Sequence, residues 1–207
     1  MRITDISGIK NITKLYNKSI MKKWIKLISN DKTILYNDYN RKKYFKPIAD
    51  IKLDNEISVN GNKKRKTVIQ FIPKIMKDEY NNKTEWLYLF MINNRIVKIG
   101  GTRIGLKGRI SSYLCGHYVK ERNKSGDCSK TNGYIYNTFE FYLNLGCKIK
   151  MYGYKLPKIE IPIKIFNKKT KIIAQTFHAY ETSFLEDYKK ENGIYPILSD
   201  KCDPNYK

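Results

Sequence analysis

The stretch WLYLFMINNRIVKIGGTRIGLKGRISSYL, residues 86 to 114, constrains the fold more than any other part of the chain. Two apolar runs, over about 86–91 and 95–100, flank a pair of asparagines. Short runs rich in branched and aromatic residues on either side of a polar turn are typical of a β-hairpin. We therefore expect a hairpin here, followed by a turn at GGTRIG and a helix.

The length of the hairpin loop decides which side chains meet across the two strands. A three-residue loop over residues 92–94 would place Tyr88 directly opposite Lys98, whereas a two-residue loop would turn Lys98 to the other face. Three-residue loops often end in a left-handed residue, a conformation that Asn94 tolerates. We expect the three-residue loop, with the phenol and the ammonium on one face.

The helix after the turn, LKGRISSYL, carries Arg109 and Tyr113 four residues apart. Residues at this spacing lie on the same face of a helix. An ordinary surface arginine stacked on a tyrosine would give the same pattern, so the pair alone does not assign a function.

A late helix, ending at Gly193, contains the sharpest anomaly in the sequence. Phe177, Phe184 and Tyr188 form an apolar stripe, and Glu181 falls within it. A carboxylate in an apolar stripe must be paired or bind a cation. A salt bridge to a buried lysine or arginine is the simple alternative to a functional site.

These residues, in this order, resemble the GIY-YIG nuclease superfamily, and the resemblance covers about residues 86–115 and 177–200. WLY stands where the family has GIY, and KIG stands where it has YIG. A lysine at the second position is similar to certain type II restriction endonucleases of the superfamily. The family's late asparagine would fall near Ser199. The site residues that the resemblance implies are Tyr88, Lys98, Arg109, Tyr113 and Glu181.

The resemblance implies an α/β (α+β) fold in which a small antiparallel sheet is flanked by helices. We expect a basic N-terminal DNA-binding arm over residues 1–80 and a catalytic domain over 81–207. This domain would carry an insertion at about 116–170, where alternating residues also indicate an added β-hairpin.

The resemblance also implies a sequence-specific double-stranded DNA endonuclease of the type II restriction kind. Tyr88, its pKa lowered by nearby Lys98, would take a proton from the attacking water. Arg109 would stabilise negative charge on phosphorus, and Tyr113 would hydrogen-bond the phosphate. Glu181 would hold Mg²⁺, or another divalent cation such as Mn²⁺. A homing or repair nuclease of the same superfamily is the alternative.

The charge of the chain agrees with a nucleic-acid partner. Lysine and arginine number 41 against 19 acidic residues, a formal net charge of +22. Such an excess favours binding to a polyanion, although AT-rich coding would also enrich a chain in lysine. A non-enzymatic nucleic-acid-binding protein therefore stays an alternative. The candidate DNA contacts are Lys63, Lys64, Arg65, Lys66, Arg103, Lys107, Lys120, Arg122 and Lys124.

Other features bear on location and assembly. No apolar run approaches the roughly 20 residues of a membrane span, and the first residues lack a secretory signal. Four cysteines without a C-x-x-C pair indicate reduced thiols, so we expect a cytoplasmic protein with no membrane partner. Cutting both strands of a symmetric site is most simply done by a two-fold homodimer.

Overall fold

The structure is a computed structural model that describes residues 33–53, 69–115 and 129–199. The expected basic tip at residues 63–66 and the expected contacts in the loop at 120–124 lie outside these residues. Within the described residues, no helix is both long enough and apolar enough to cross a membrane.

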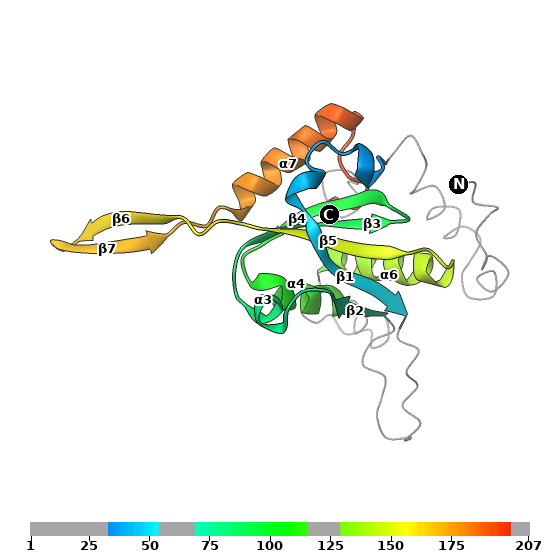
Figure 1. The fold of residues 1–207 in the computed structure, drawn as a ribbon, viewed down its shortest axis with the longest axis horizontal. Helices are drawn as coiled ribbons and strands as arrows, with labels where there is room; N and C mark the ends of the chain where they lie inside the picture. The colour runs from blue at the N-terminus through cyan, green and yellow to red at the C-terminus, as the bar shows by residue number, and fades with distance from the viewer. Residues whose placement is uncertain (1–32, 54–68, 116–128, 200–207) are drawn as a thin grey trace, which may run out of the picture.

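A five-stranded antiparallel sheet in the order β2-β1-β5-β3-β4 forms the centre of the fold (Figure 1). Helices cover both faces, which confirms the expected fold class. The strands are β1 (Lys46–Leu53), β2 (Ile69–Pro73), β3 (Trp86–Ile92), β4 (Arg95–Thr102) and β5 (Ile149–Lys155). The helices are α3 (Lys77–Asn81), α4 (Gly105–Leu114), α6 (Lys130–Asn144) and α7 (Phe177–Asn192), with short 3-10 turns at Tyr36–Asp38 and Lys42–Tyr44.

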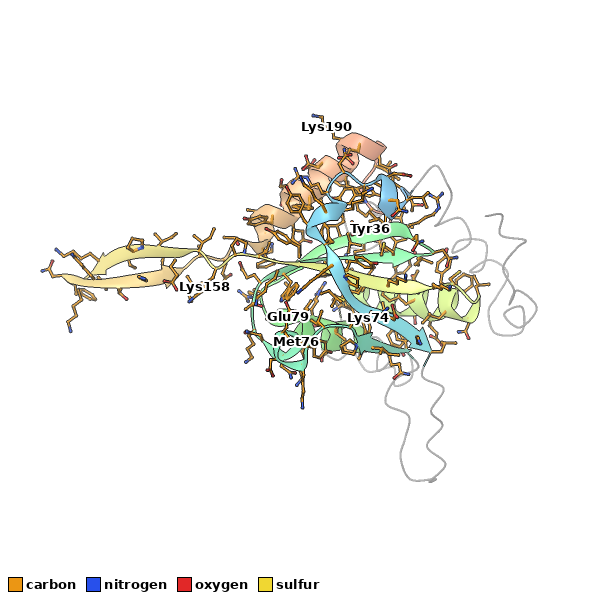
Figure 2. All side chains as sticks on the ribbon, in the orientation of Figure 1. Tyr36, Lys74, Met76, Glu79, Lys158 and Lys190 are labelled. Atoms are coloured by element: carbon orange, nitrogen blue, oxygen red, sulfur yellow. The ribbon has the colours of Figure 1, made fainter. Side chains whose placement is uncertain are left out.

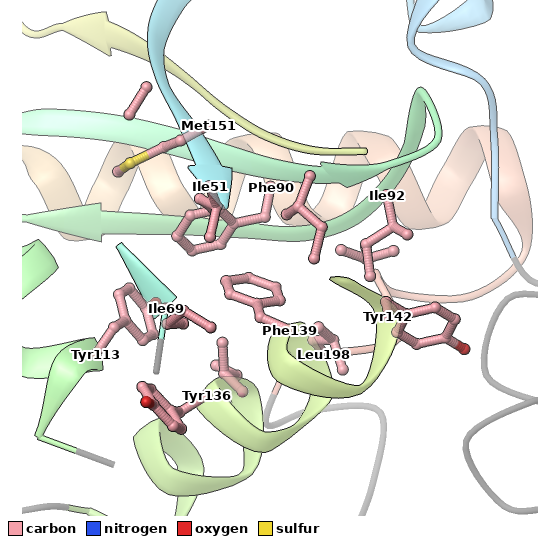
Figure 3. Close-up of a cluster of buried hydrophobic side chains, with 14 of the residues drawn as sticks. Ile51, Ile69, Phe90, Ile92, Tyr113, Tyr136, Phe139, Tyr142, Met151 and Leu198 are labelled. Carbon is pink, nitrogen blue, oxygen red and sulfur yellow. The ribbon is translucent and has the colours of Figure 1, made fainter. Parts of the chain in front are cut away.

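Strand β3 is buried at every position because it pairs on both sides and is covered on both faces. Its side chains alternate between two cores, as the pleat of a strand requires. Tyr88 and Phe90 face a core shared with α4 and α6, and Figure 3 shows Phe90 beside Phe139 of α6. Leu87 and Leu89 face a second core shared with α7.

The expected three-residue hairpin loop is wrong. Ile92 pairs with Arg95, and the loop is the two-residue turn Asn93–Asn94, with φ values of 48° and 63°. Both residues adopt the left-handed conformation that a type I′ turn requires, and asparagine tolerates it.

A β-bulge in β4 changes the face of the sheet on which Lys98 lies. Met91 pairs with Ile96 but Phe90 pairs with Lys98, so one extra residue is inserted between the two pairs. The bulge returns Lys98 to the face of Tyr88, although the partner of Tyr88 is Gly100 rather than Lys98. The expected shared face is present, but the expected direct opposition is not.

The remaining chain divides between the sheet and a separate arm. Strands β1 and β2, from the segment expected as an N-terminal arm, hydrogen-bond into the same sheet as β3. Within the expected insertion, α6 and β5 form part of the central layers. Strands β6 (Glu160–Ile165) and β7 (Lys168–Ile173) form a two-stranded arm that projects from the body (Figure 1).

Candidate active site

Two phenols and a guanidinium form a closed hydrogen-bonded cluster between β3 and α4. The Tyr88 and Tyr113 hydroxyl oxygens are 2.8 Å apart. Arg109 donates from Nε to the Tyr88 hydroxyl at 2.7 Å and from Nη2 to the Tyr113 hydroxyl at 2.9 Å. The guanidinium also lies 4.5 Å from the centre of the Tyr113 ring, within the range of a cation–π contact. The expected shared face of Arg109 and Tyr113 on a helix is confirmed.

Of the two tyrosine hydroxyl protons in the cluster, only one takes part in a hydrogen bond within it. Arg109 donates to both phenols, and one phenol donates to the other. The remaining hydroxyl proton has no acceptor within the cluster. Tyr88 and Tyr113 are fully buried, whereas Arg109 is half-buried. Arg109 is thus the member of the cluster that is accessible from solvent.

The electrostatics of Tyr88 differ from the sequence-based expectation. Burial raises the pKa of Tyr88, while the charge of Arg109 and the hydrogen bond from Tyr113 lower it by less. Burial likewise raises the pKa of Tyr113 well above the ordinary tyrosine value. The expectation that a nearby lysine lowers the pKa of Tyr88 is wrong: the charge that lowers it is that of Arg109, and desolvation of the phenolate outweighs this effect. Both phenols are neutral at pH 7.

Lys98 is buried and hydrogen-bonded to the segment that follows α7. Its Nζ donates to the carbonyl oxygen of Leu198 at 3.1 Å, and Leu198 N–H donates to the carbonyl of Val97 at 2.8 Å. Ser199, where the resemblance expects asparagine, is also buried, and its hydroxyl forms no hydrogen bond with any residue that the structure describes.

Glu181 on α7 approaches strand β4 from the face of the sheet opposite to the one that Tyr88 occupies. The backbone N–H of Gly101 donates a hydrogen bond to its carboxylate. This N–H lies on β4, which is an edge of the sheet. The structure therefore places Glu181 close to β4, which carries Lys98 and pairs with β3, the strand of Tyr88.

Two adjacent glycines make room for this arrangement, a point that the sequence-based reasoning missed although GG is visible in the sequence. A Cβ on Gly100 would lie 2.5 Å from the Tyr88 hydroxyl oxygen. A Cβ on Gly101 would lie 2.9 Å from Glu181 Oε2 and 2.7 Å from a ring carbon of Phe177. Only glycine permits the strand to be this close to a phenol on one face and a carboxylate on the other.

The charge state of Glu181 is set by opposing effects. Burial raises its pKa, and the positive charges of Lys98 and Arg109, the Gly101 N–H and His178 lower it. The net result is a pKa above the ordinary 4.5 of glutamate. The charge of Arg109 thus acts on both the phenols and the carboxylate, which links the two halves of the site.

A single carboxylate fits a magnesium site that is completed by substrate. Mg²⁺ commonly takes one or two carboxylates, several waters and substrate phosphate oxygens. Glu181 offers oxygen donors of the right chemistry, and its charge interacts with that of Arg109. The described residues contain no group of three or more histidine, cysteine, aspartate or glutamate side chains that could form a complete protein site.

A groove with a volume of about 850 Å³ lies between the start of α4 and the base of the β6–β7 arm. Arg103, one of the expected DNA contacts, lines it and donates to Gln175 Oε1 at 3.4 Å. Lys107, another expected contact, is exposed on α4. The other cationic residues along the groove are Lys83, Lys155 and Lys158.

No protein-family model and no curated protein matches the sequence. Solved structures with a similar fold include the following two. The restriction endonuclease HPY188I in complex with product DNA has a TM-score of 0.48 and 22% identity, over 79% of this chain and 84% of that chain. A mutant of bacteriophage T4 EndoII has a TM-score of 0.45 and 20% identity, over 71% of this chain and 90% of that chain. The roles proposed below for side chains rest on the geometry of the site.

Proposed function

We propose that this protein is a metal-dependent endonuclease that hydrolyses phosphodiester bonds of double-stranded DNA, with sequence specificity of the type II restriction kind. The observation that carries the proposal is the three-way contact of Arg109 with Tyr88 and Tyr113, close to the Glu181 carboxylate held at Gly101. The residue types and order are those of the GIY-YIG resemblance. The net charge of +22 supports a polyanionic substrate.

Arg109 is the proposed ligand of the scissile phosphate. Hydrolysis adds negative charge to the phosphoryl oxygens, and a guanidinium stabilises this charge with two directed hydrogen bonds. Because Arg109 now donates to both phenols, its movement onto a phosphate would free the hydroxyl oxygen of Tyr88. Phosphate binding and exposure of the proposed proton acceptor would then occur together.

Tyr88 is the proposed acceptor of a proton from the attacking water. A neutral phenol cannot gain a proton without losing its own, and Tyr113 lies 2.8 Å away to receive it. Tyr113 can in turn pass its hydroxyl proton to a phosphate oxygen. This relay leaves both phenols neutral at the end, which agrees with their raised pKa values.

Glu181 would hold Mg²⁺ or Mn²⁺ through its carboxylate. A divalent cation there would supply positive charge at the leaving oxygen and a bound water able to protonate it. The Gly101 N–H orients the carboxylate for this role, and Lys98 adds positive charge nearby. Two copies of the chain would be needed to cut both strands symmetrically, so we include a homodimer in the proposal.

The test is digestion of a long DNA of known sequence with Mg²⁺. The wild-type chain is compared with Glu181→Gln and Tyr88→Phe, and with Glu186→Gln as a matched control. Glu186 is on the same helix and accepts a hydrogen bond from Tyr195 at 2.7 Å, which glutamine can also accept. We expect discrete fragments with the wild type and the control, and loss of cutting in the other two.

Three results would change the proposal in different ways. Intact DNA with the wild type, while the chain still binds DNA, would favour the non-enzymatic alternative. Cutting by Glu181→Gln at the wild-type rate would remove Glu181 from the site. Cutting confined to branched or damaged DNA would favour a repair nuclease over a restriction enzyme.

A further inference from the structure

The β6–β7 arm has two chemically different faces. Residues that pair directly across an antiparallel ribbon lie on the same face. One face is mostly apolar, the other carries three of the four strand lysines, and no residue of either strand is buried. The apolar face consists of the pairs Ile161–Ile172, Ile163–Thr170 and Ile165–Lys168, and the cationic face of Glu160–Ile173, Pro162–Lys171 and Lys164–Lys169.

Contacts among the residues that the structure describes do not account for the composition of this arm. A lone two-stranded ribbon is marginally stable, and Lys164 directly opposite Lys169 adds repulsion. At the tip, Phe166 has φ of 44° and is 96% exposed. This conformation is disfavoured for a bulky side chain, and no burial compensates for it. A partner that neutralises the lysines and covers the ring would compensate for both.

The charge of the arm selects the class of partner. Lys164, Lys168, Lys169 and Lys171 stand against one acid, Glu160, which already contacts Lys158 and Lys171. A second copy of the arm would bring the same positive charges together. A polyanion would instead be attracted along the whole ribbon.

The base of the arm lies beside a groove that extends to the helix of Arg109. The groove at its base is lined by Lys158 and Ile173 of the arm region, by Arg103 and by Gly108. Gly108 immediately precedes Arg109 on α4. Figure 2 shows Lys158 where the arm leaves the body, with side chains standing on both sides of the ribbon beyond it. Cationic side chains thus extend from α4 to the tip of the arm.

We propose that the β6–β7 arm lies in a groove of the DNA duplex beside the cleaved bond, with its lysines on backbone phosphates and Phe166 against the bases. The inference rests on the proposed function, which supplies the duplex. A two-stranded ribbon fits a DNA groove, and exposed phenylalanine side chains can wedge between base pairs. Six residues of strand span roughly 20 Å, so the arm would cover roughly six base pairs.

The first experiment measures how DNA binding depends on salt concentration. A fluorescent duplex is titrated with the full chain, without divalent cations, at several salt concentrations. Each lost phosphate contact reduces the magnitude of the negative slope of log K against log salt by about 0.9. We expect Lys164→Gln/Lys169→Gln to reduce this magnitude by about 1.8. The control Lys189→Gln/Lys190→Gln removes the same charge at the far end of α7 (Figure 2) and should change the slope much less.

The second experiment examines Phe166 at the tip of the β6–β7 arm. Phe166→Ala should weaken duplex binding roughly 5- to 100-fold with the salt slope unchanged, as expected for loss of a base–aromatic contact. Phe166→Trp should retain binding because it keeps an aromatic face. The arm buries no residue, so the thermal unfolding midpoint of every variant should match the wild type, which is checked by circular dichroism.

The outcomes separate this inference from the proposed function. If the wild type binds and cuts DNA but the arm and control variants have equal slopes, and Phe166→Ala binds like the wild type, the arm does not contact DNA and the inference is wrong. If the arm variants instead alter sedimentation mass, the arm is a contact between copies, which also overturns it. Failure of the wild type to bind any duplex would overturn the proposed function itself.

Discussion

Strand β3 and the β6–β7 arm both carry large apolar side chains, yet these have opposite surroundings. Every residue of β3 is buried, and no residue of the arm is. In β3, packing on two faces determines where Tyr88 lies and keeps its hydroxyl within reach of Tyr113 and Arg109. In the arm, nothing in the described chain covers the side chains. Precise positioning of the Tyr88 hydroxyl thus comes from the core, whereas the side chains of the arm stay mostly exposed.

The sharpest way to test this contrast is to truncate one apolar side chain in each region. Leu89→Ala in β3 should lower the free energy of unfolding by about 2–5 kcal/mol, because it opens a cavity in a sealed core. Ile165→Ala in the arm, where the side chain is 47% exposed, should change it by less than about 0.5 kcal/mol. Chemical denaturation measures both. Equal effects would mean that the arm packs on the body in solution.

The next largest effect should come from Arg109→Lys, which keeps the charge but loses the planar pair of donors. We expect the rate of DNA cleavage to fall roughly 100-fold or more, since lysine lacks the planar pair of donors that Arg109 would turn from the phenols to a phosphate. Single-turnover cleavage measures it. Lys190→Arg, an exposed change in the last turn of α7, is the control, and near-wild-type cleavage by Arg109→Lys would show that charge alone suffices.

Comparing alanine substitutions at two glycines separates the effect of a steric collision at β4 from the effect of ordinary helix propensity on α6. Gly101→Ala should destabilise the fold by about 1–3 kcal/mol and weaken metal binding, because its Cβ would collide with Glu181 and Phe177. Gly133→Ala on α6 meets no atom within 4 Å and should stabilise the fold by about 0.5–1 kcal/mol. Thermal unfolding compares the two. A neutral Gly101→Ala would show that α7 shifts easily away from β4.

The smallest expected effect is a displaced pH dependence. Glu181 must be ionised to hold a cation, and its pKa lies above the ordinary 4.5. Metal affinity should therefore begin to fall, on acidification, at a higher pH than for an exposed glutamate, and then by tenfold per pH unit. Mn²⁺ titrations at a series of pH values measure this. An onset below pH 4.5 would contradict the raised pKa.

The same group affects stability with a defined sign. Because the pKa of Glu181 is higher in the folded state than in the unfolded chain, the folded state binds more protons between the two values. Its contribution to stability should decrease as the pH rises through this window and be regained below it. Glu181→Gln should abolish this part of the pH dependence.

The sequence predicted the hairpin, the helix with Arg109 and Tyr113, and the late helix with Glu181, because each depends on local periodicity. It did not predict the two-residue turn with its bulge, since both loop lengths agree with the same apolar runs. It also did not predict that Lys98 bonds to Leu198, a contact between residues 100 positions apart. The sign of the Tyr88 pKa shift was missed because burial is a property of the assembled core.

The sequence by itself determined which chemical groups are available: two phenols, a guanidinium, an ammonium and a carboxylate, on elements with recognisable periodicity. Only the tertiary structure decided how these groups meet. The bulge brings Lys98 to the face of Tyr88, and the Gly100–Gly101 pair lets Tyr88 and Glu181 approach β4 from opposite sides. Side-chain periodicity is local, whereas distances between elements depend on the packing of the whole core.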